Sequence, residues 1–193
     1  FKWSPDSSRI AFVADALTDN VMELFVVNRD GTNRVRINGT LPTGGDVFAF
    51  DWAPNSSQLA YSGDQTVDGY SDIWVAAADG SARQKVSATA LPSGTGATNP
   101  RWSPDGNKIL YQGTLFTPGV WQLFAVNNDG TSHAQISGPM VAGGGLYAPA
   151  INPWSGDSTQ VLYYADQQTN ETYELFAAAA DGSGNVKVNG TLA

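Results

Sequence analysis

Hydrophobic residues along the chain gather in short runs, separated by polar loops rich in Gly, Pro, Asn and Asp. The runs hold many β-branched and aromatic residues, a composition typical of strands, and no stretch of helix length shows a 3.6-residue apolar period. The clearest runs are apolar at nearly every position instead of alternating with polar residues. They predict strands at residues 9–13, 23–27, 58–61, 72–76, 108–111, 122–126, 160–164 and 174–178.

A set of landmark residues repeats at intervals of about 50 residues. Each unit carries an Asp-Gly pair, which is a strong signal for a hairpin between two strands. The pairs start at Asp30, Asp79, Asp129 and Asp181. Three units open on a Trp-x-Pro motif, at Trp3, Trp52 and Trp102, whereas the fourth has a displaced Trp154. Aromatic residues recur in the central strands of every unit, at Phe12, Phe25, Tyr61, Trp74, Tyr111, Phe124, Tyr163 and Phe176.

The repeat predicts an all-β fold, a β-propeller with four blades of four-stranded antiparallel sheet. Continuously apolar strands need cover on both faces of their sheet, and a propeller supplies it because each blade packs between two neighbours. A sandwich would instead leave one face of each sheet polar. We place the blades at residues 1–46, 47–96, 97–147 and 148–193.

The pattern W-S-P-D-x-x-x-I-A-F, followed by E-L-F-V-V-N-x-D-G-T, resembles the repeat of the TolB C-terminal propeller, a divergent relative of the WD repeat. The resemblance covers essentially the whole chain and departs from the motif in the fourth unit, at residues 152–157. It implies a TolB-like propeller and a bacterial protein located in the periplasm or outside the cell. Function is left open, because propellers of this type serve both as binding or scaffold proteins and as domains of peptidases.

We expect the chain to be part of a larger propeller. Residues 189–192 repeat the Asn-Gly-Thr-Leu of residues 38–41, and after that segment the first unit continues into another blade. A ring is commonly closed by one blade that takes strands from both termini, and the sequence shows no such divided blade.

Charge and composition exclude several kinds of partner. The chain has 10 Lys and Arg residues against 18 Asp and Glu, a formal net charge of −8, so nucleic acid and anionic membrane surfaces are repelled. No segment stays apolar for the width of a bilayer, so direct membrane insertion is not expected. The absence of cysteine excludes disulfides and thiolate chemistry.

The sequence predicts no catalytic residue and no cofactor other than a weakly bound calcium ion, so the protein is expected not to be an enzyme. His133 is the single histidine and follows an Asp-Gly turn, whereas a Ser-His-Asp triad needs a buried and oriented histidine. Zinc sites need several His or Cys ligands. Glycine clusters such as residues 143–145 precede no helix and lack a phosphate-binding lysine, so we interpret them as linkers.

The candidate binding face is the end of the blades that carries the long loops. If the strands of a blade are A to D, the B–C and D–A connections lie at one end and the A–B and C–D turns at the other. The long connections therefore share one face, where aromatic side chains would anchor a partner. These candidates are Tyr70, Phe116, Trp121, Tyr147 and Tyr173. For any one ring, the alternative is that it folds over the blade as local core.

We therefore interpret the chain as a non-catalytic binding or scaffold propeller whose loop face contacts a protein partner, a larger assembly or a glycan. The alternative is the gating propeller domain of a prolyl-oligopeptidase-like serine peptidase, with the catalytic domain outside this chain. A G-x-S-x-G motif elsewhere in the full gene would favour the peptidase.

Acidic residues recur at every fourth position in the B–C connections of three units. They are Asp15, Asp19 and Glu23, then Asp64, Asp68 and Asp72, and finally Asp166 and Glu174. Each set brings like charges across a hairpin, which a weakly bound calcium ion would offset. The third unit has Thr114, Pro118 and Gln122 at these positions. The preferred alternative is that the acids cap the amides of their own loop.

Overall fold

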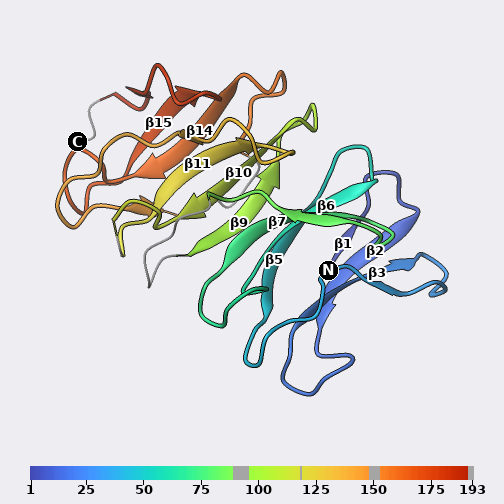
Figure 1. The fold of residues 1–193 in the computed structure, drawn as a ribbon. Coiled ribbons are helices and arrows are strands. Elements are labelled where there is room, and N and C mark those ends of the chain that lie inside the picture. Colours follow the sequence, from blue (N-terminus) through green and yellow to red (C-terminus); the bar gives the residue numbers. More distant parts are fainter. Residues whose placement is uncertain (89–95, 118, 148–152, 191–193) are drawn as a thin grey trace.

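The computed structural model describes residues 1–88, 96–117, 119–147 and 153–190; Pro118 and residues 151–152 of the fourth motif lie outside this part. The described residues form four four-stranded antiparallel sheets (Figure 1). In each sheet the strands neighbour one another in chain order, so every sheet is a meander. Over the same residues there is no helix long and apolar enough to cross a bilayer.

The four sheets are the predicted blades, numbered 1 to 4 along the chain. Blade 1 holds β1 (Lys2–Trp3), β2 (Arg9–Ala14), β3 (Glu23–Asn28) and β4 (Val35–Arg36). Blade 2 holds β5 (Val47–Trp52), β6 (Gln58–Gly63), β7 (Asp72–Ala77) and β8 (Arg83–Lys85). Blade 3 holds β9 (Ala97–Trp102), β10 (Lys108–Gly113), β11 (Gln122–Asn127) and β12 (Ala134–Gln135). Blade 4 holds β13 (Leu146–Tyr147), β14 (Gln160–Ala165), β15 (Glu174–Ala179) and β16 (Val186–Lys187).

Blade 4 begins earlier than the boundary at residue 148 that the sequence suggested. Its first strand, β13, pairs Leu146 with Ala165 at the end of β14. The displaced Trp154 forms an isolated bridge with Val161 near the beginning of the same strand. The first strand of blade 4 is thus made of two separate pairings, and the Trp motif marks only the second of them.

The recurring aromatic residues face one another across the two central strands of each blade. Their registers are Phe12 with Phe25, Tyr61 with Trp74, Tyr111 with Phe124, and Tyr163 with Phe176. In blades 1, 3 and 4 the rings stack, with centroids 5.5, 5.6 and 5.6 Å apart. Directly opposed aromatic pairs of this kind are among the favourable cross-strand contacts in a sheet.

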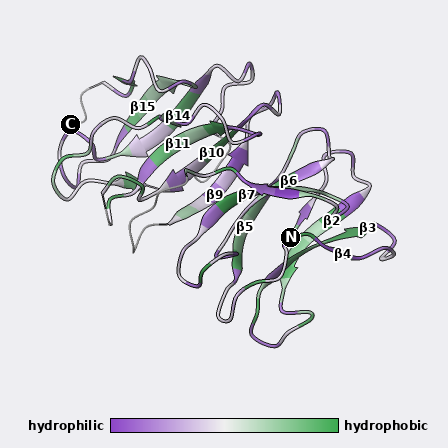
Figure 2. Cartoon of the chain, in the orientation of Figure 1, coloured by the Kyte–Doolittle hydropathy of each residue, from purple (hydrophilic) through white to green (hydrophobic). Residues whose placement is uncertain are grey.

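The hydrophobic cores lie between neighbouring blades, and each has two unlike sides. The lower-numbered blade contributes an aliphatic face, represented by Leu24 and Ile37 of blade 1. The higher-numbered blade contributes an aromatic face, represented by Trp52 and Tyr61 of blade 2. Figure 2 shows the hydrophobic stretches along β3 and β5 that supply this contact. Burying each large side chain contributes roughly 2–3 kcal/mol.

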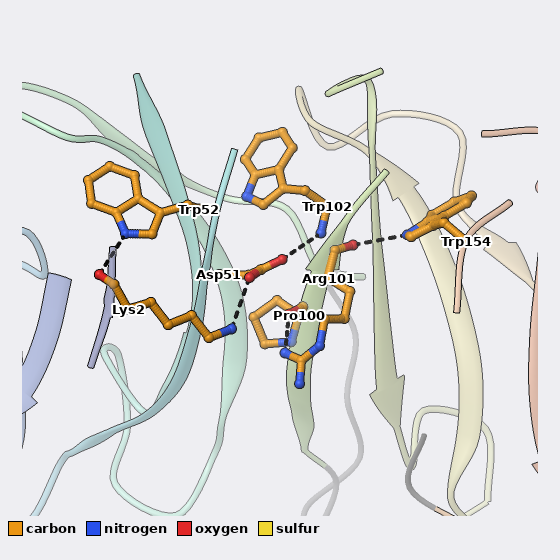
Figure 3. Close-up of polar contacts among 7 residues, drawn as sticks. All are labelled: Lys2, Asp51, Trp52, Pro100, Arg101, Trp102 and Trp154. Carbon is orange, nitrogen blue, oxygen red and sulfur yellow. Dashed lines mark hydrogen bonds and ion pairs between the residues drawn. The ribbon is translucent and has the colours of Figure 1, made fainter. Parts of the chain in front are cut away.

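Polar contacts near the Trp motif also join neighbouring blades (Figure 3). The Trp52 indole donates to the Lys2 carbonyl at 3.3 Å, and the Trp154 indole donates to the Arg101 carbonyl at the same distance. Asp51 accepts the Lys2 ammonium at 2.9 Å and the backbone N–H of Trp102 at 3.1 Å. The motif thus fixes how successive blades are aligned.

The four blades form an open arc, a partial propeller, with blades 1 and 4 at opposite ends (Figure 1). Within the arc β6 and β10 are buried at nearly every position, as their apolar sequences predict. In β14 exposed and buried residues alternate instead. Among the described residues no blade packs on the outer face of blade 4, so the expected cover on both faces is seen there only for the inner blades.

The A–B turn that follows each Trp motif is held by an Asp or Asn side chain. Asp6 accepts hydrogen bonds from Ser4 and from the amide and hydroxyl of Ser8. Asp157 does the same in blade 4 with Ser155 and Thr159. These bonds favour the ionised form and lower the pKa of Asp6 and of Asp157 to about 2.

Replacing Asp6 and Asp157 together by Asn should make the fold less sensitive to acid. Their pKa rises from about 2 in the folded chain to the ordinary 3.8 on unfolding. The two carboxylates therefore contribute fully to the free energy of unfolding above about pH 4, and this contribution is lost as the pH falls through about 2. The difference in unfolding free energy between wild type and double variant should close over this range, as measured by urea unfolding at each pH.

The second blade provides a matched control for this prediction. Asn55 accepts the same bonds from Ser57 without a titrating group. The variant Asn55→Asp should therefore gain an acid-dependent contribution over the same range. If the difference between wild type and Asp6→Asn/Asp157→Asn stays constant from pH 4 to pH 2, the role given to the two carboxylates is wrong.

Candidate binding groove between blades 2 and 3

A groove opens between blades 2 and 3 at the end of the blades that carries the long loops. Its volume is about 400 Å³. Its lining residues are Phe48, Asp64, Gly69, Ser71, Gly96, Thr114, Gly119 and Trp121. The B–C loops of both blades and the beginnings of β5 and β9 contribute to it. The groove therefore lies on the face that the sequence analysis singled out for binding.

Two partly exposed aromatic side chains line the groove, and each has a local cause. Phe48 is 55% exposed because β5 bulges there: Val47 pairs with Gly63 and Ala49 with Ser62, so Phe48 has no partner in the ladder. Such a bulge redirects a side chain. Trp121 is 40% exposed and immediately precedes β11. Both rings thus stand on strand ends, which hold them more firmly than loop tips would.

The polar side chains of the groove hold its walls in place. Asp64 is 3% exposed and accepts the backbone N–H groups of Asp46 and Gly69 at 2.7 and 3.0 Å. Ser71 donates to the Ala97 carbonyl, and the Thr114 hydroxyl accepts the N–H of Gly96. Because these groups are engaged with the backbone, the groove is preformed. The groove therefore offers a ligand two aromatic contact surfaces with polar groups beside them.

The five aromatic candidates do not form one site. Trp121 lines the groove, whereas Tyr147 and Tyr173 meet edge to face, with centroids 5.4 Å apart, on blade 4. Phe116 is 67% exposed and contacts the ring of Phe124 edge-on, and Tyr70 is half-buried. The structure thus places Trp121 in the groove and brings Tyr147 and Tyr173 together on blade 4, and a binding role for the five residues remains a prediction.

Sequence reasoning missed Phe48 and Tyr164. Tyr164 is 48% exposed on the outer face of blade 4 and lines an apolar hollow with Tyr147 and Tyr173. Tyr164 lies inside the predicted strand at residues 160–164, both faces of which were expected to be covered. The run Val-Phe-Ala-Phe at residues 47–50, with two rings near the start of a strand, is the signal that could have drawn attention to Phe48.

The acidic candidates for calcium are occupied by the protein itself. Asp64 caps its loop, and Asp166 likewise accepts the N–H groups of Gly145 and Glu171. The acids that begin the third strands form ion pairs with the fourth strands, all with N–O distances of 2.8 Å. The pairs are Glu23 with Arg36, Asp72 with Lys85, and Glu174 with Lys187.

The remaining acidic candidates, Asp15, Asp19 and Asp68, are exposed in the B–C connections. Across the described part of the chain, no three His, Asp or Glu side chains gather closely enough to hold a metal ion. The hydrogen bonds support the capping alternative, and calcium binding remains a prediction from the sequence. His133 is exposed beside the Asp-Gly turn of blade 3.

The fold defines the class of molecule: a partial β-propeller, similar in fold to solved TolB structures. Three solved structures illustrate the similarity, all below 20% sequence identity. A structure assigned to TolB from Agrobacterium tumefaciens has 18% identity and a TM-score of 0.65 over 96% of this chain. TolB from Acinetobacter baumannii has 14% identity and a TM-score of 0.61 over 96%. The β-propeller domain of the Trilobed protease from Pyrococcus furiosus has 16% identity and a TM-score of 0.60 over 97%.

This chain spans only part of those proteins. It covers 62% of the Agrobacterium chain, 41% of the Acinetobacter chain and 56% of the Pyrococcus chain. No protein-family model and no curated protein sequence matches it. The TM-scores establish the propeller fold. At identities this low they do not establish a function, which has to be argued from the groove.

Proposed function

We propose that the chain is a non-catalytic binding propeller that contacts a protein partner through the groove between blades 2 and 3. The observation that carries the proposal is the pair of partly exposed rings, Phe48 and Trp121, in one preformed hollow. Aromatic side chains in a concave surface are the commonest anchors of protein recognition. A glycan stacked on the same rings is the other ligand that this arrangement suits. A location in the periplasm or outside the cell belongs to the same proposal and is supported by the TolB-like fold alone.

A displayed peptide library and a glycan array, both screened with the purified chain, test the proposal. Peptides that bind should lose at least about tenfold in affinity when Trp121 or Phe48 is replaced by Ala, since central aromatic anchors commonly contribute 2 kcal/mol or more. Both side chains are substantially exposed, so circular dichroism should show that the variants stay folded.

The control variant is His133→Ala, because His133 is exposed at the opposite end of the blades. Its affinity for the same peptides should equal that of wild type. Binders that tolerate both groove variants would show that the groove is not the site. Binders found only among glycans would replace the protein partner by a carbohydrate.

The second candidate function is the propeller domain of a serine peptidase. It is supported by the similarity to the propeller domain of the Trilobed protease. Sequencing the complete gene separates the two: a downstream hydrolase domain with a G-x-S-x-G nucleophile turn would favour the peptidase.

A further inference from the structure

A second pocket, of about 280 Å³, opens beside the first strands of blades 1 to 3. The first strands β5 and β9 of neighbouring blades lie side by side, on the side of the blades that surrounds the central channel of a propeller. Because that channel stays open in a complete ring, the pocket does not depend on where the chain ends. Phe48 lines both this pocket and the groove, so the two hollows meet at its ring.

Within the described part of the chain, Arg101 in this pocket has no carboxylate partner. Lys2, Asp51 and Arg101 hold equivalent positions, one residue before the Trp of blades 1 to 3. One Asp51 oxygen accepts the Lys2 ammonium at 2.9 Å, and the other accepts the Trp102 backbone N–H at 3.1 Å. Figure 3 shows the Arg101 side chain beside Pro100 instead, to whose carbonyl it donates at 2.8 Å. The nearest acid of the series is thus fully engaged, and one positive charge is left without a counter-charge.

A bulge in β9 positions this guanidinium. Asn99 and Pro100 together face the single residue Tyr111 of β10. Asn99 has a left-handed φ of 53°, which is costly for a residue that precedes proline, and its side-chain amide is held by a bond of 3.0 Å to Gln112. Strained bulges of this kind redirect side chains and occur next to functional sites. The bulge at Phe48 in β5 lines the same pocket, so two separate bulges shape it.

Charge and reach define the ligand that fits both hollows. A planar guanidinium binds a carboxylate through two parallel hydrogen bonds. The chain as a whole has a net charge of −8, so an anion is repelled unless it also makes contacts of another kind, which the rings of the groove supply. In β9, Arg101 stands five residues after Gly96 of the groove, a distance of about 16 Å along a strand. An extended peptide of about five residues therefore spans the groove and the pocket.

The geometry points to a peptide ligand that places a carboxylate on Arg101 and an aromatic or aliphatic side chain against Phe48 and Trp121. The inference rests on the proposed function and deepens it, because it states the chemistry of the partner: an acidic segment with an apolar residue nearby. The carboxylate belongs either to an Asp or Glu side chain or to the end of the partner chain.

Fluorescence anisotropy with two libraries of labelled, carboxy-terminally amidated heptapeptides tests this inference. All peptides carry a fixed Trp, and about two to five residues from it, in either direction, one library carries Glu and the other Gln. The best Glu peptides should bind at least about tenfold more tightly than the same peptides with Gln, since the carboxylate adds a charge-assisted pair. Arg101→Gln should remove this difference and leave the affinity of the Gln peptides unchanged. Gln peptides with a free carboxyl terminus that regain the affinity would assign the carboxylate to a chain end.

The matched control is Arg29→Gln, which removes the same charge from an exposed side chain that lines neither hollow. It should bind Glu peptides like wild type, and an equal loss in both variants would overturn the inference in favour of a net-charge effect. Circular dichroism should show Arg101→Gln to be folded, because the Trp154 indole bonds to the backbone carbonyl of Arg101, which the variant keeps.

Two further outcomes separate this inference from the proposed function. Peptides that bind equally with Glu and Gln, and that lose affinity in Trp121→Ala and not in Arg101→Gln, overturn the inference and leave the groove as a binding site. Libraries in which no peptide binds overturn the proposed function and this inference with it, and acidic glycans that bind through Arg101 in their place would show that the ligand is not a peptide.

Discussion

Replacing Phe124 by Ala should lower the free energy of unfolding by about 3–5 kcal/mol, the range for large aromatic side chains deleted from a core. Phe124 is 3% exposed, stacks on Tyr111 and packs in the core between blades 2 and 3. Its loss removes apolar burial and leaves a cavity that stiff strands on both sides cannot close. Urea unfolding followed by far-ultraviolet circular dichroism measures the change.

The comparison variant is Trp74→Ala at the equivalent position of blade 2. Trp74 is only half-buried, and its indole N–H is enclosed without a hydrogen-bond partner. Removing it relieves an unsatisfied donor while it deletes apolar contact, so the loss should be smaller, about 1–3 kcal/mol. Equal losses for the two variants would contradict the view that burial between blades sets the contribution of each ring.

Replacing Lys85 by Gln should destabilise the fold by about 1–3 kcal/mol, because it leaves a buried carboxylate without its counter-charge. Asp72 is 4% exposed and bonds to Lys85 and to the Ser87 hydroxyl, each at 2.8 Å. The Lys85 side chain is 26% exposed, so water screens the pair and keeps the loss below that of a fully buried one. The same unfolding experiment measures the effect.

Blade 3 carries no charge at the two equivalent positions, although the Gln122 Oε1 is buried there without a hydrogen-bond partner and Gln135 donates to the Ser137 carbonyl. It has Gln122 where blade 2 has Asp72 and Gln135 where blade 2 has Lys85, as the strand registers show. The double variant Asp72→Gln/Lys85→Gln should therefore be more stable than Lys85→Gln alone. Lys2→Gln is the exposed control: the Lys2 side chain is 41% exposed in its pair with Asp51, and its loss should cost less than about 1 kcal/mol. A double variant no more stable than Lys85→Gln would show that the charge of Asp72 is not the cause.

The strand order and the Asp-Gly hairpins could be predicted from the sequence. The Asp-Gly turn at Asp129 closes a hairpin between residues that are near in the chain, and a hairpin fixes its register locally. That turn sets Phe124 opposite Gln135. The pairing of Tyr111 with Phe124 belongs to β10 and β11, which a longer loop joins, so the Asp-Gly turn does not fix it. Repetition of this unit predicts stacked sheets.

The candidate site could be predicted only in part. Trp121 was found because it adjoins a strand at the loop-rich end, and the groove does lie there. Phe48 was missed because its exposure comes from a bulge against β6, which depends on how two strands pair. The acidic residues were recognised from their regular spacing in the B–C connections. The structure pairs Asp72 with Lys85 on the next strand, and that partner cannot be read from spacing within the loop.

The sequence by itself determined the blade: its four strands and its turns, which follow from contacts between residues close in the chain. The tertiary structure decided which faces are covered. Leu110 and Leu162 have the same residue type and register, yet one is 1% and the other 48% exposed. The difference arises because burial of these side chains depends on whether another blade packs against them. Hydrophobic contact is non-directional, so the sequence of one repeat does not show whether its face is covered.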